Sequence, residues 1–393
     1  MPTNENDVIH ITPGAVIDGL DGNDLFHWTG GSAIIEGGAD GFDRDPYQPY
    51  DLAVGMTTGD MLRIGGDQGV FVRFDGWNNG YATLLGDRLD MTGIERVYAT
   101  AGADTVRASH ATSWDGWQGV SIFAGAGDDD ITGSAYEDVI DGGTGNDIIR
   151  AGAGNDFINS STGDDLIYGG AGDENIRWGI GDAHWHNPGD DTIYGGEGRD
   201  LINVWVKDGD FDGADHVAGG HVTIAATRQW GDFTGAATVG NGAGVSTLRF
   251  QGFEQGWTHE GADTVDGSGA SVWGTVGIHW NTRWGDDLLI GTAGNDTLEG
   301  GEGSDTITGG AGDDLISANG DFYRLDAPGD GDADTIIFAA GDGHDTVIGF
   351  DAGLDTVQIA GGEFQAVSTP DGTLLTLDSG DTLLLAGIFD FEV

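Results

Sequence analysis

Residues 124–177 read AGAGDDDIT GSAYEDVID GGTGNDIIR AGAGNDFIN SSTGDDLIY GGAGDENIR, six nine-residue units in unbroken register. Each unit has an acidic residue at position 6 and an isoleucine at position 8. The glycines in the first half of a unit allow a tight turn at positive φ. The last three residues then form a short strand whose position 8 points inward. Because two units make one coil, we expect each residue to lie above the residue eighteen positions earlier.

The acidic residue at position 6 gives these turns a metal-binding character. A carboxylate is a hard oxygen ligand, turn carbonyls add further oxygens, and glycine leaves room for a cation beside the backbone. The pattern G-G-x-G-x-D-x-U-x is that of a calcium repeat. We therefore expect an all-β fold, a right-handed parallel β-roll or β-helix in two modules, that binds multiple Ca2+ ions. The predicted ligands are Asp24, Asp104, Asp129, Asp138, Asp147, Asp156, Asp165, Glu174, Asp191, Asp200, Asp263, Asp287, Asp296, Asp305, Asp314, Asp334 and Asp345.

Further repeats flank the central run. An early unit occupies 19–27, two units (186–203) follow an eight-residue insertion (178–185), and four units fill 282–317. Residues 93–114 also align with residues 252–273, and each segment leads into a repeat series, so we expect two related modules. The predicted parts are an N-terminal cap with the first repeat (1–45), an irregular β lead-in (46–98), a first calcium roll (99–203), a second lead-in (204–257), a second calcium roll (258–348), and a C-terminal cap with a secretion signal (349–393).

The composition narrows the classes of partner. The 393 residues have a formal net charge of −53 and include no cysteine. Nucleic acid and anionic membranes are poor partners for such a charge, and the lack of cysteine excludes disulfides and thiolate metal sites. No stretch approaches the ~18 apolar residues of a membrane span. The first residues lack the basic and apolar regions of a cleaved signal peptide. Calcium turns of this kind still favour an extracellular protein, where calcium is roughly millimolar.

The repeats and the C-terminal tail resemble the repeats-in-toxin (RTX) family of type I secreted calcium-binding proteins. The resemblance implies an uncleaved C-terminal export signal, here Asp390-Phe391-Glu392-Val393, read by the type I secretion machinery. It also implies folding outside the cell, where calcium is available. The H-E-x-x-H sequence of the zinc protease branch and the G-x-S-x-G sequence of the lipase branch are both absent. The family resemblance therefore identifies a folding module and leaves the activity open.

Tryptophan and histidine are unusually frequent for a β-roll and are clustered. WGIGDAHWHNPGDD (178–191) and VGIHWNTRWGDD (276–287) place flat rings beside imidazole, amide and guanidinium groups, which suits a sugar chain. The alternative is that these rings cover apolar ends of the roll or pack the modules together. The expected polysaccharide contacts are Trp185, Asn187, Asn203, His279, Trp280, Asn281, Arg283 and Trp284.

Position 9 of each unit faces outward, so outward residues two units apart should stack. If the insertion loops out, one column contains Arg150, Tyr168 and Tyr194, and the other contains Asn159, Arg177 and Asn203. Beside a His-rich loop, such residues could neutralise a uronate carboxylate and move its C5 proton. The candidate catalytic residues are His184, His186, Tyr168, Arg177, Arg150 and Tyr194. The column expected in the second module, Ile290, Glu299, Thr308 and Ser317, lacks this chemistry.

Two functions stay open at this point. The first is a secreted, calcium-dependent β-roll protein that binds extracellular or cell-surface polysaccharide. The second is a polysaccharide lyase or C5-epimerase that acts on a uronate-containing chain, with its site on the first roll module.

Overall fold

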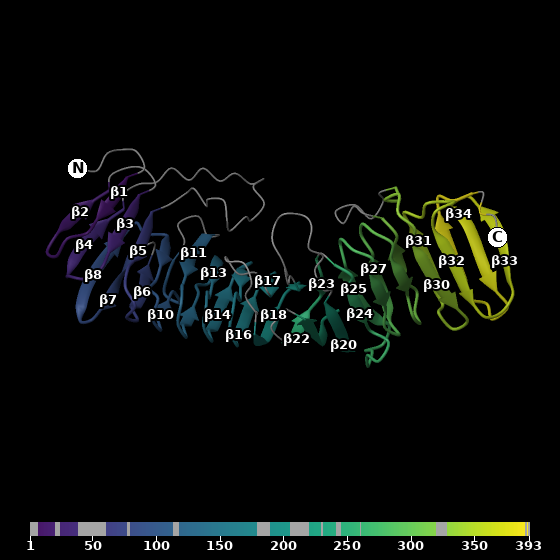
Figure 1. Cartoon of the computed structure of the whole chain (residues 1–393), viewed down its shortest axis with the longest axis horizontal. Coiled ribbons are helices and arrows are strands. Elements are labelled where there is room, and N and C mark those ends of the chain that lie inside the picture. Colours follow the sequence, from purple (N-terminus) through teal and green to yellow (C-terminus); the bar gives the residue numbers. More distant parts are fainter. Residues whose placement is uncertain are drawn as a thin grey trace. The chain divides into compact units, whose positions relative to one another are not determined.

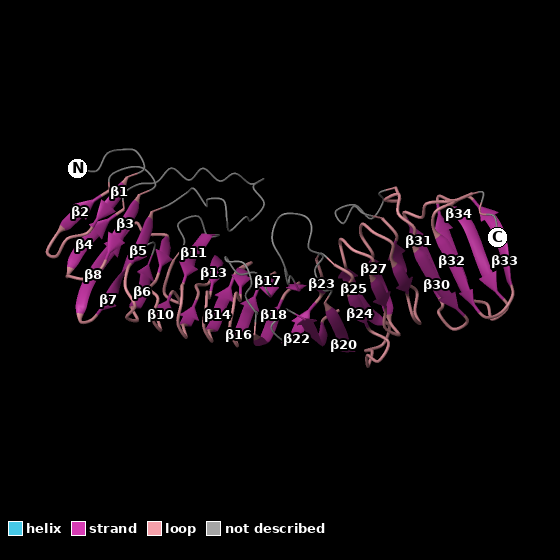
Figure 2. Cartoon of the chain, in the orientation of Figure 1, coloured by secondary structure: helices cyan, strands magenta, loops and turns pink. Residues whose placement is uncertain are grey.

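The computed structural model describes residues 7–19, 24–37, 60–76, 79–112, 118–178, 189–204, 220–228, 231–240, 245–259, 261–319, 328–389 and 391. In these residues every regular element is a strand and none is a helix (Figure 2). The described part of the chain accordingly has no helix that could span a membrane. The chain divides into two compact units, Met1–Gly198 and Arg199–Val393. The predicted all-β fold is confirmed.

Unit 1 contains two largely parallel sheets (Figure 1). The first sheet contains β1 (Val8–His10), β3 (Leu25–Trp28), β5 (Met61–Ile64), β9 (Arg96–Tyr98), β11 (Gln118–Phe123), β13 (Glu137–Asp141), β15 (Phe157–Asn159) and β17 (Asn175–Trp178). The second sheet contains β2 (Val16–Asp18), β4 (Ala33–Glu36), β8 (Asp87–Thr92), β7 (Asn79–Leu84), β6 (Phe71–Gly76), β10 (Thr105–Arg107), β12 (Asp130–Thr132), β14 (Ile148–Ala153), β16 (Leu166–Ala171) and β18 (Asp190–Glu197).

Unit 2 repeats this arrangement of two sheets. Its first sheet contains β19 (Leu201–Val204), β23 (Gln255–Trp257), β25 (Val276–Asn281), β27 (Asn295–Glu299), β29 (Leu315–Ser317), β31 (His344–Ile348), β35 (Thr382–Ala386), β34 (Gly372–Leu377) and β33 (Phe364–Thr369). Its second sheet contains β22 (Val245–Phe253), β21 (Phe233–Gly240), β20 (His221–Thr227), β24 (Thr264–Asp266), β26 (Leu288–Ile290), β28 (Thr306–Thr308), β30 (Thr335–Ala339) and β32 (Thr356–Ala360).

The register of the central strands follows the repeat. Ile131 pairs with Ile149, and Ile149 pairs with Ile167, so successive coils are eighteen residues apart as predicted. Ile167 then pairs with Ile193, because the eight inserted residues leave the strand register unchanged. All four side chains are fully buried. Position 8 of each unit therefore builds the core between the two sheets.

An antiparallel meander of three strands interrupts the parallel coil in each unit. In unit 1, β6, β7 and β8 are antiparallel, and β6 pairs in parallel with β10. In unit 2, β20, β21 and β22 are antiparallel, and β20 pairs in parallel with β24. The turn between β7 and β8 has Leu85 at φ 53 and Gly86 at φ 92, and a type I′ hairpin requires positive φ at both positions. Hairpin turns replace the nine-residue repeat here, which is why the lead-in sequences look irregular.

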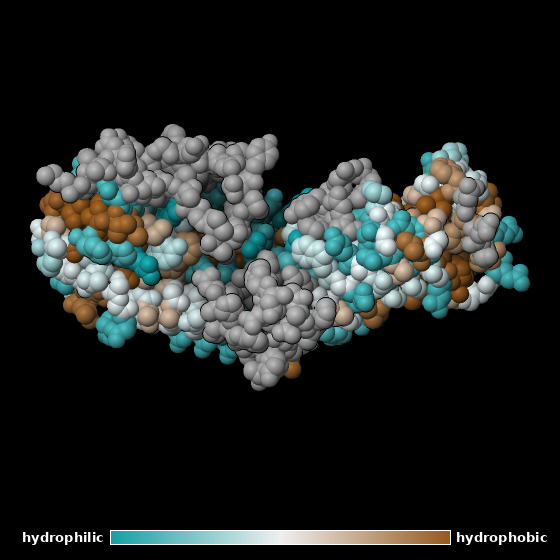
Figure 3. Space-filling view, turned by 45° about the horizontal axis from the view of Figure 1, so that its top comes forward, coloured by the Kyte–Doolittle hydropathy of each residue, from teal (hydrophilic) through white to brown (hydrophobic). Residues whose placement is uncertain are grey.

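The first two coils of unit 1 expose apolar side chains. Val8, Val16 and Ile34 are 64%, 72% and 42% exposed. Figure 3 shows apolar surface gathered where β1 to β4 lie. In the described residues β1 pairs only with β3 and β2 only with β4, so no earlier coil covers this end.

Trp280 does not contact solvent, although the sequence predicted it as a polysaccharide contact. It lies at an inward position of β25, is fully buried, and packs against Phe233 with ring centroids 5.8 Å apart. Its register partner is Gly256, where an added Cβ would lie 2.1 Å from the indole ring. Glycine on the neighbouring strand thus makes room for the ring, and Trp280 is a core residue of unit 2.

We predict that Trp280→Ala lowers the free energy of unfolding by about 3–5 kcal/mol, the range for large aromatic side chains removed from a core. The measurement is denaturant unfolding in excess calcium, followed by far-UV circular dichroism. The matched control is Trp273→Ala, because Trp273 is 59% exposed; it should change stability by less than about 0.5 kcal/mol. Equal unfolding midpoints for the two variants would contradict a core role for Trp280.

Candidate calcium sites and outward faces of the roll

Acidic side chains stack in the turns that precede the strands. The backbone N–H of Asp129 donates to Oδ1 of Asp147 over 2.8 Å, and the N–H of Asp147 donates to Oδ1 of Asp165 over 2.8 Å. We call a series linked in this way an acid ladder. The ladders of unit 1 are Asp7, Asp24, Asp60 and Glu95; Asp104, Asp129, Asp147, Asp165 and Asp191; and Asp138 and Asp156. Those of unit 2 are Asp200 and Glu254; Asp263, Asp287, Asp305, Asp334 and Asp355; and Asp296, Asp314 and Asp345.

Every predicted calcium ligand is at most 4% exposed. The ladders also contain acids that the sequence analysis missed: Asp7, Asp60, Glu95, Glu254 and Asp355. An aliphatic residue follows two positions after four of these acids, as in Asp60-Met61-Leu62, so a search for that triplet without glycine would have found them. Glu254 gives no such signal, because the residue two positions later is Gly256.

The second carboxylate oxygen of many ladder acids is buried and has no hydrogen-bond donor. These atoms are Oδ2 of Asp24, Asp129, Asp147, Asp156, Asp165, Asp305, Asp314 and Asp334. Leaving such an oxygen without a partner is unfavourable by several kcal/mol. A Cβ built on Gly142 would lie 2.5 Å from Oδ2 of Asp147, and one built on Gly309 would lie 2.3 Å from Oδ2 of Asp314. In these two turns a side chain on the position 1 residue would collide with the carboxylate.

Burial raises the pKa of many ladder carboxyls. Burial raises the pKa of Asp147 to about 7 and that of Asp129 to about 8. At Asp165 burial and the charge of Asp191 together raise the pKa to about 10. The hydrogen bond from the preceding coil lowers each pKa in part. Near neutral pH these carboxyls therefore need either a proton or a cation.

Calcium fits these turns. It takes about six to eight oxygen ligands, and carboxylates and backbone carbonyls are both suitable. Within the described residues no three Asp, Glu or His side chains converge on one point. An ion would therefore be held by one or two carboxylates together with turn carbonyls. The unpaired Oδ2 atoms are the natural first ligands, and the charge of the ion would stabilise the ionised carboxylates.

Three of the predicted calcium ligands have hydrogen-bond donors at both carboxylate oxygens. Both carboxylate oxygens of Asp104, Asp138 and Asp296 already accept hydrogen bonds from the chain. These three acids lack the open oxygen that makes their neighbours suitable for a cation.

The predicted column of Arg150, Tyr168 and Tyr194 lies on the outward face of the second sheet of unit 1. Strands β14, β16 and β18 hold the three residues in register. The tyrosine rings stack with centroids 5.1 Å apart and planes 7° apart. The guanidinium carbon of Arg150 lies 5.8 Å from the centroid of the Tyr168 ring. Tyr168 is 40% exposed, so this column faces solvent.

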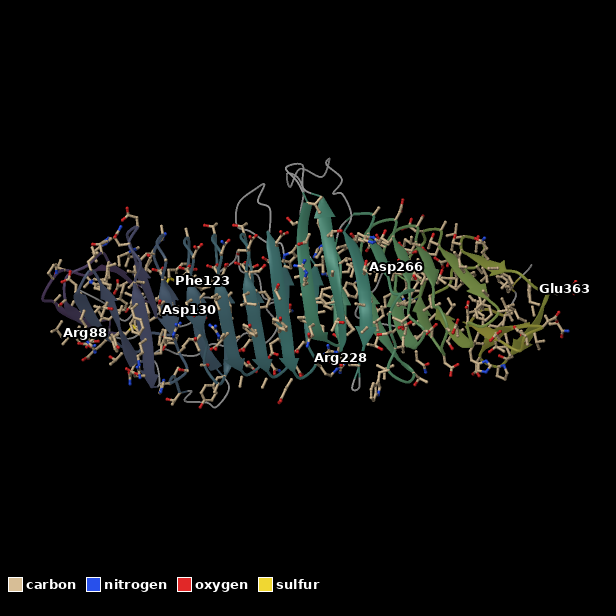
Figure 4. All side chains as sticks on the ribbon, turned by 90° about the horizontal axis from the view of Figure 1, so that it is seen from below. Arg88, Phe123, Asp130, Arg228, Asp266 and Glu363 are labelled. Carbon is tan, nitrogen blue, oxygen red and sulfur yellow. The ribbon has the colours of Figure 1, made fainter. Side chains whose placement is uncertain are left out.

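Asp130, labelled in Figure 4, lies on β12 beside this column and links it to Arg107. Its carboxylate pairs with Arg107 on one side and with Arg150 on the other, where Nη1 of Arg150 lies 3.2 Å from Oδ1. We call Arg107, Asp130, Arg150, Tyr168 and Tyr194 the outward strip. Arg107, Arg150, Tyr168 and Tyr194 share one register column, to which β12 contributes Thr132, and Asp130 lies beside that column two positions earlier on β12.

Arg177 and Asn159 lie elsewhere, on the first sheet of unit 1. Successive nine-residue units alternate between the two sheets, and the two outward faces point in opposite directions. Arg177 on β17 and Tyr168 on β16 are therefore not brought together in one site. The guanidinium of Arg177 lies 4.5 Å from the centroid of the Phe157 ring, and Asn159 is only 3% exposed.

Four candidate residues, His184, Trp185, His186 and Asn187, lie outside the described residues, as do Asp390, Glu392 and Val393 of the predicted export signal. Asn203 belongs to unit 2, where it is 2% exposed and pairs in register with Trp257.

The remaining candidates form a polar group on the first sheet of unit 2. Nε2 of His279 lies 2.6 Å from Oε1 of Glu299, and Nδ2 of Asn281 donates to Oε2 of Glu299 over 2.8 Å. The guanidinium of Arg283 lies 3.2 Å from Nε2 of His259 and 4.6 Å from the centroid of the Trp284 ring. Arg283 also has φ 73, at a turn position where most repeats have glycine.

Glu299 was expected in a column with Ile290 and Thr308, and that column is wrong. Ile290 and Thr308 pair in register on the second sheet of unit 2, whereas Glu299 and Ser317 pair on the first sheet. The alternation of units between sheets again explains the difference. Glu299 is 4% exposed, so its bonds to His279 and Asn281 hold the group together beneath the surface.

Comparisons with known proteins agree with this geometry. The family of RTX calcium-binding nonapeptide repeats matches four segments, residues 123–158, 151–182, 187–204 and 282–316. No curated protein matches the chain. Among solved structures, the extracellular lipase LipA from Serratia marcescens is 19% identical with a TM-score of 0.18, over 64% of this chain and 37% of the lipase chain. This chain thus spans little more than a third of the lipase. The repeat matches and the two parallel sheets show that the chain contains RTX-type calcium-binding nonapeptide repeats, which build a β-roll.

Proposed function

We propose that this is a secreted protein whose roll folds on calcium and binds extracellular or cell-surface polysaccharide through the outward strip of unit 1. The observation that carries the proposal is the exposed stack of Tyr168 on Tyr194, with Arg150 next in line. Secretion by type I machinery is part of the proposal and rests on the family.

The proposed calcium ligands are the ladder acids with an unpaired Oδ2. Their carboxylates are buried, one oxygen of each has no hydrogen-bond donor, and burial raises their pKa values, as at Asp129. The net charge of −53 favours the same assignment, because buried carboxylates stacked one coil apart repel one another until cations neutralise them.

The chemistry of the outward strip suits a sugar chain. Flat tyrosine rings offer apolar faces for the C–H faces of sugar rings, and their hydroxyls bond at the edges. Arg150 adds a planar donor for hydroxyl or carboxylate oxygens. Neighbouring parallel strands lie about 4.8 Å apart, so a polymer lying along the coil axis would meet one strip residue after another.

Binding, and not turnover, is the role proposed for the strip. The lyase or epimerase alternative combined Tyr168 with Arg177 and with the histidines of the insertion. Arg177 lies on the other sheet, and the two histidines lie outside the described residues. Within the strip itself no histidine accompanies the tyrosines to act as a base.

We predict that Asp147→Asn raises the calcium concentration needed for folding. One calcium site filled at ~100 times its Kd contributes about 2.7 kcal/mol of apparent stability, which the variant would lose. A circular dichroism titration with calcium measures the midpoint of the β signal. The control is Asp67→Asn, an exposed acid outside the ladders with the same change of charge. If wild-type protein keeps its full β spectrum after a chelator has removed calcium, the calcium assignment is wrong.

We predict that Tyr168→Ala weakens polysaccharide binding by about three- to tenfold, as expected for the loss of about 0.5–1.5 kcal/mol of aromatic contact. Calcium-loaded protein is titrated calorimetrically with neutral and uronate-containing polysaccharides. The matched control is Tyr98→Ala, because Tyr98 stacks on Phe123 at 4.4 Å on the other sheet. If Tyr98→Ala weakens binding and Tyr168→Ala does not, the binding face is the first sheet and the proposal fails.

A further inference from the structure

We infer that Asp104, Asp138 and Asp296 are not calcium ligands: each starts an acid ladder, and a hydroxyl residue in its own turn replaces the cation. The inference rests on the proposed role of the other ladder acids as calcium ligands. It departs from the nine-residue pattern, which treats these three acids like their neighbours.

We call the hydroxyl residue that bonds both oxygens of the acid the cap, and at Asp296 the cap is Thr292. The hydroxyl of Thr292 donates to Oδ1 over 3.0 Å, and the backbone N–H of Thr292 donates to Oδ2 over 2.6 Å. The N–H of Gly294 donates in turn to the Thr292 hydroxyl over 3.0 Å. No carboxylate oxygen is left without a donor.

The same arrangement occurs twice in unit 1. Thr100 donates through its hydroxyl and its N–H to the two oxygens of Asp104, each over 2.7 Å. Ser134 donates to the two oxygens of Asp138 over 2.8 Å and 2.5 Å. In all three turns the hydroxyl residue precedes the acid by four positions. Because the arrangement occurs three times and in both units, it is a recurrent structural feature of this fold.

Capped and open turns differ at one residue. In the open turns of Asp147, Asp314 and Asp165 position 2 lies in the left-handed region, with Gly143 at φ 91, Gly310 at φ 100 and Ser161 at φ 66. Among the described residues, the capping residues Thr100, Ser134 and Thr292 do not have positive φ. Their N–H groups therefore point at the carboxylate. Because two donors already face this carboxylate, a cation there would meet positive hydrogen atoms in place of open oxygens.

Each cap stands at the first acid of its ladder. The N–H groups that reach Oδ1 from the preceding coil belong to Val70, Val120 and Ile278, each over 2.6 Å. None of these is acidic, so the first acid has no carboxylate partner in the coil before it. A hydroxyl closes this end of the ladder, much as a side-chain oxygen closes the first turn of a helix. The first turn of the ladder can then hold its shape without calcium and present its N–H to the next acid.

The test compares two neighbours in one ladder, Asp296→Asn and Asp314→Asn. Calcium bound per chain is measured by atomic emission after gel filtration of the loaded, full-length protein. We expect Asp296→Asn to keep the wild-type number of ions and Asp314→Asn to lose at least one. If both variants lose calcium equally, Asp296 is a ligand and the inference is overturned. If Asp314→Asn loses none, the assignment of open acids as ligands fails first, and the inference fails with it.

A second variant covers the case in which an asparagine variant does not fold. Thr292→Gly changes GTAGNDTLE to the open pattern GGAGNDTLE. The variant removes the hydroxyl donor from Oδ1 of Asp296 and lets residue 292 adopt the left-handed conformation of open turns, which would take its N–H away from Oδ2. The calcium midpoint for folding should then rise by about twofold or more. Thr308→Gly, at an outward position of β28, controls for the loss of a threonine side chain and should leave the midpoint unchanged. A wild-type midpoint for Thr292→Gly would overturn the inference.

Discussion

The fold depends on a buried carboxylate that receives one hydrogen bond from the preceding coil and leaves its second oxygen open. The bond from the N–H of Asp147 to Oδ1 of Asp165 fixes the rise from coil to coil. Oδ2 of Asp165 is buried without a hydrogen-bond donor, so this arrangement is unfavourable until a cation binds there. One side chain thus sets the geometry of the roll and makes it depend on calcium. In the turn of Asp147 this geometry also requires glycine, because a Cβ on Gly142 would lie 2.5 Å from Oδ2 of Asp147.

The regular part of the fold could be predicted from the sequence because its period is explicit. Eighteen-residue spacing, inward isoleucines and the unchanged register across the insertion all follow from counting residues, as the pairing of Tyr168 with Tyr194 illustrates. The antiparallel meanders could not be predicted in the same way. Their strands have no fixed period, and the turn at Leu85 and Gly86 uses positive φ at a residue that gives no sequence signal.

The candidate sites were predicted less well, because position within a repeat does not reveal the sheet on which a residue lies. Consecutive units alternate between sheets, so Tyr168 and Arg177 are close in sequence and point from opposite sides. Burial was also not predicted for Trp280, which is inward because it pairs with the buried Leu298 eighteen residues later. Glu299 bonds to His279 and Asn281 beneath the surface, which the repeat pattern does not indicate. The acids at position 6 and the column of Arg150, Tyr168 and Tyr194 could be located from the pattern, because both follow from the eighteen-residue period.

The separation of turns from strand faces explains how such a roll can acquire a surface function. The calcium chemistry is confined to buried turn acids, and the core is confined to inward aliphatic residues such as Ile149. Outward strand positions take part in neither, so their side chains can vary without disturbing folding. On the second sheet of unit 2 these positions hold the uncharged Ile290 and Thr308. On the second sheet of unit 1 they hold Arg150, Tyr168 and Tyr194 in register. The core and the turns do not use these three side chains, and for that reason the binding role that we propose is assigned to them.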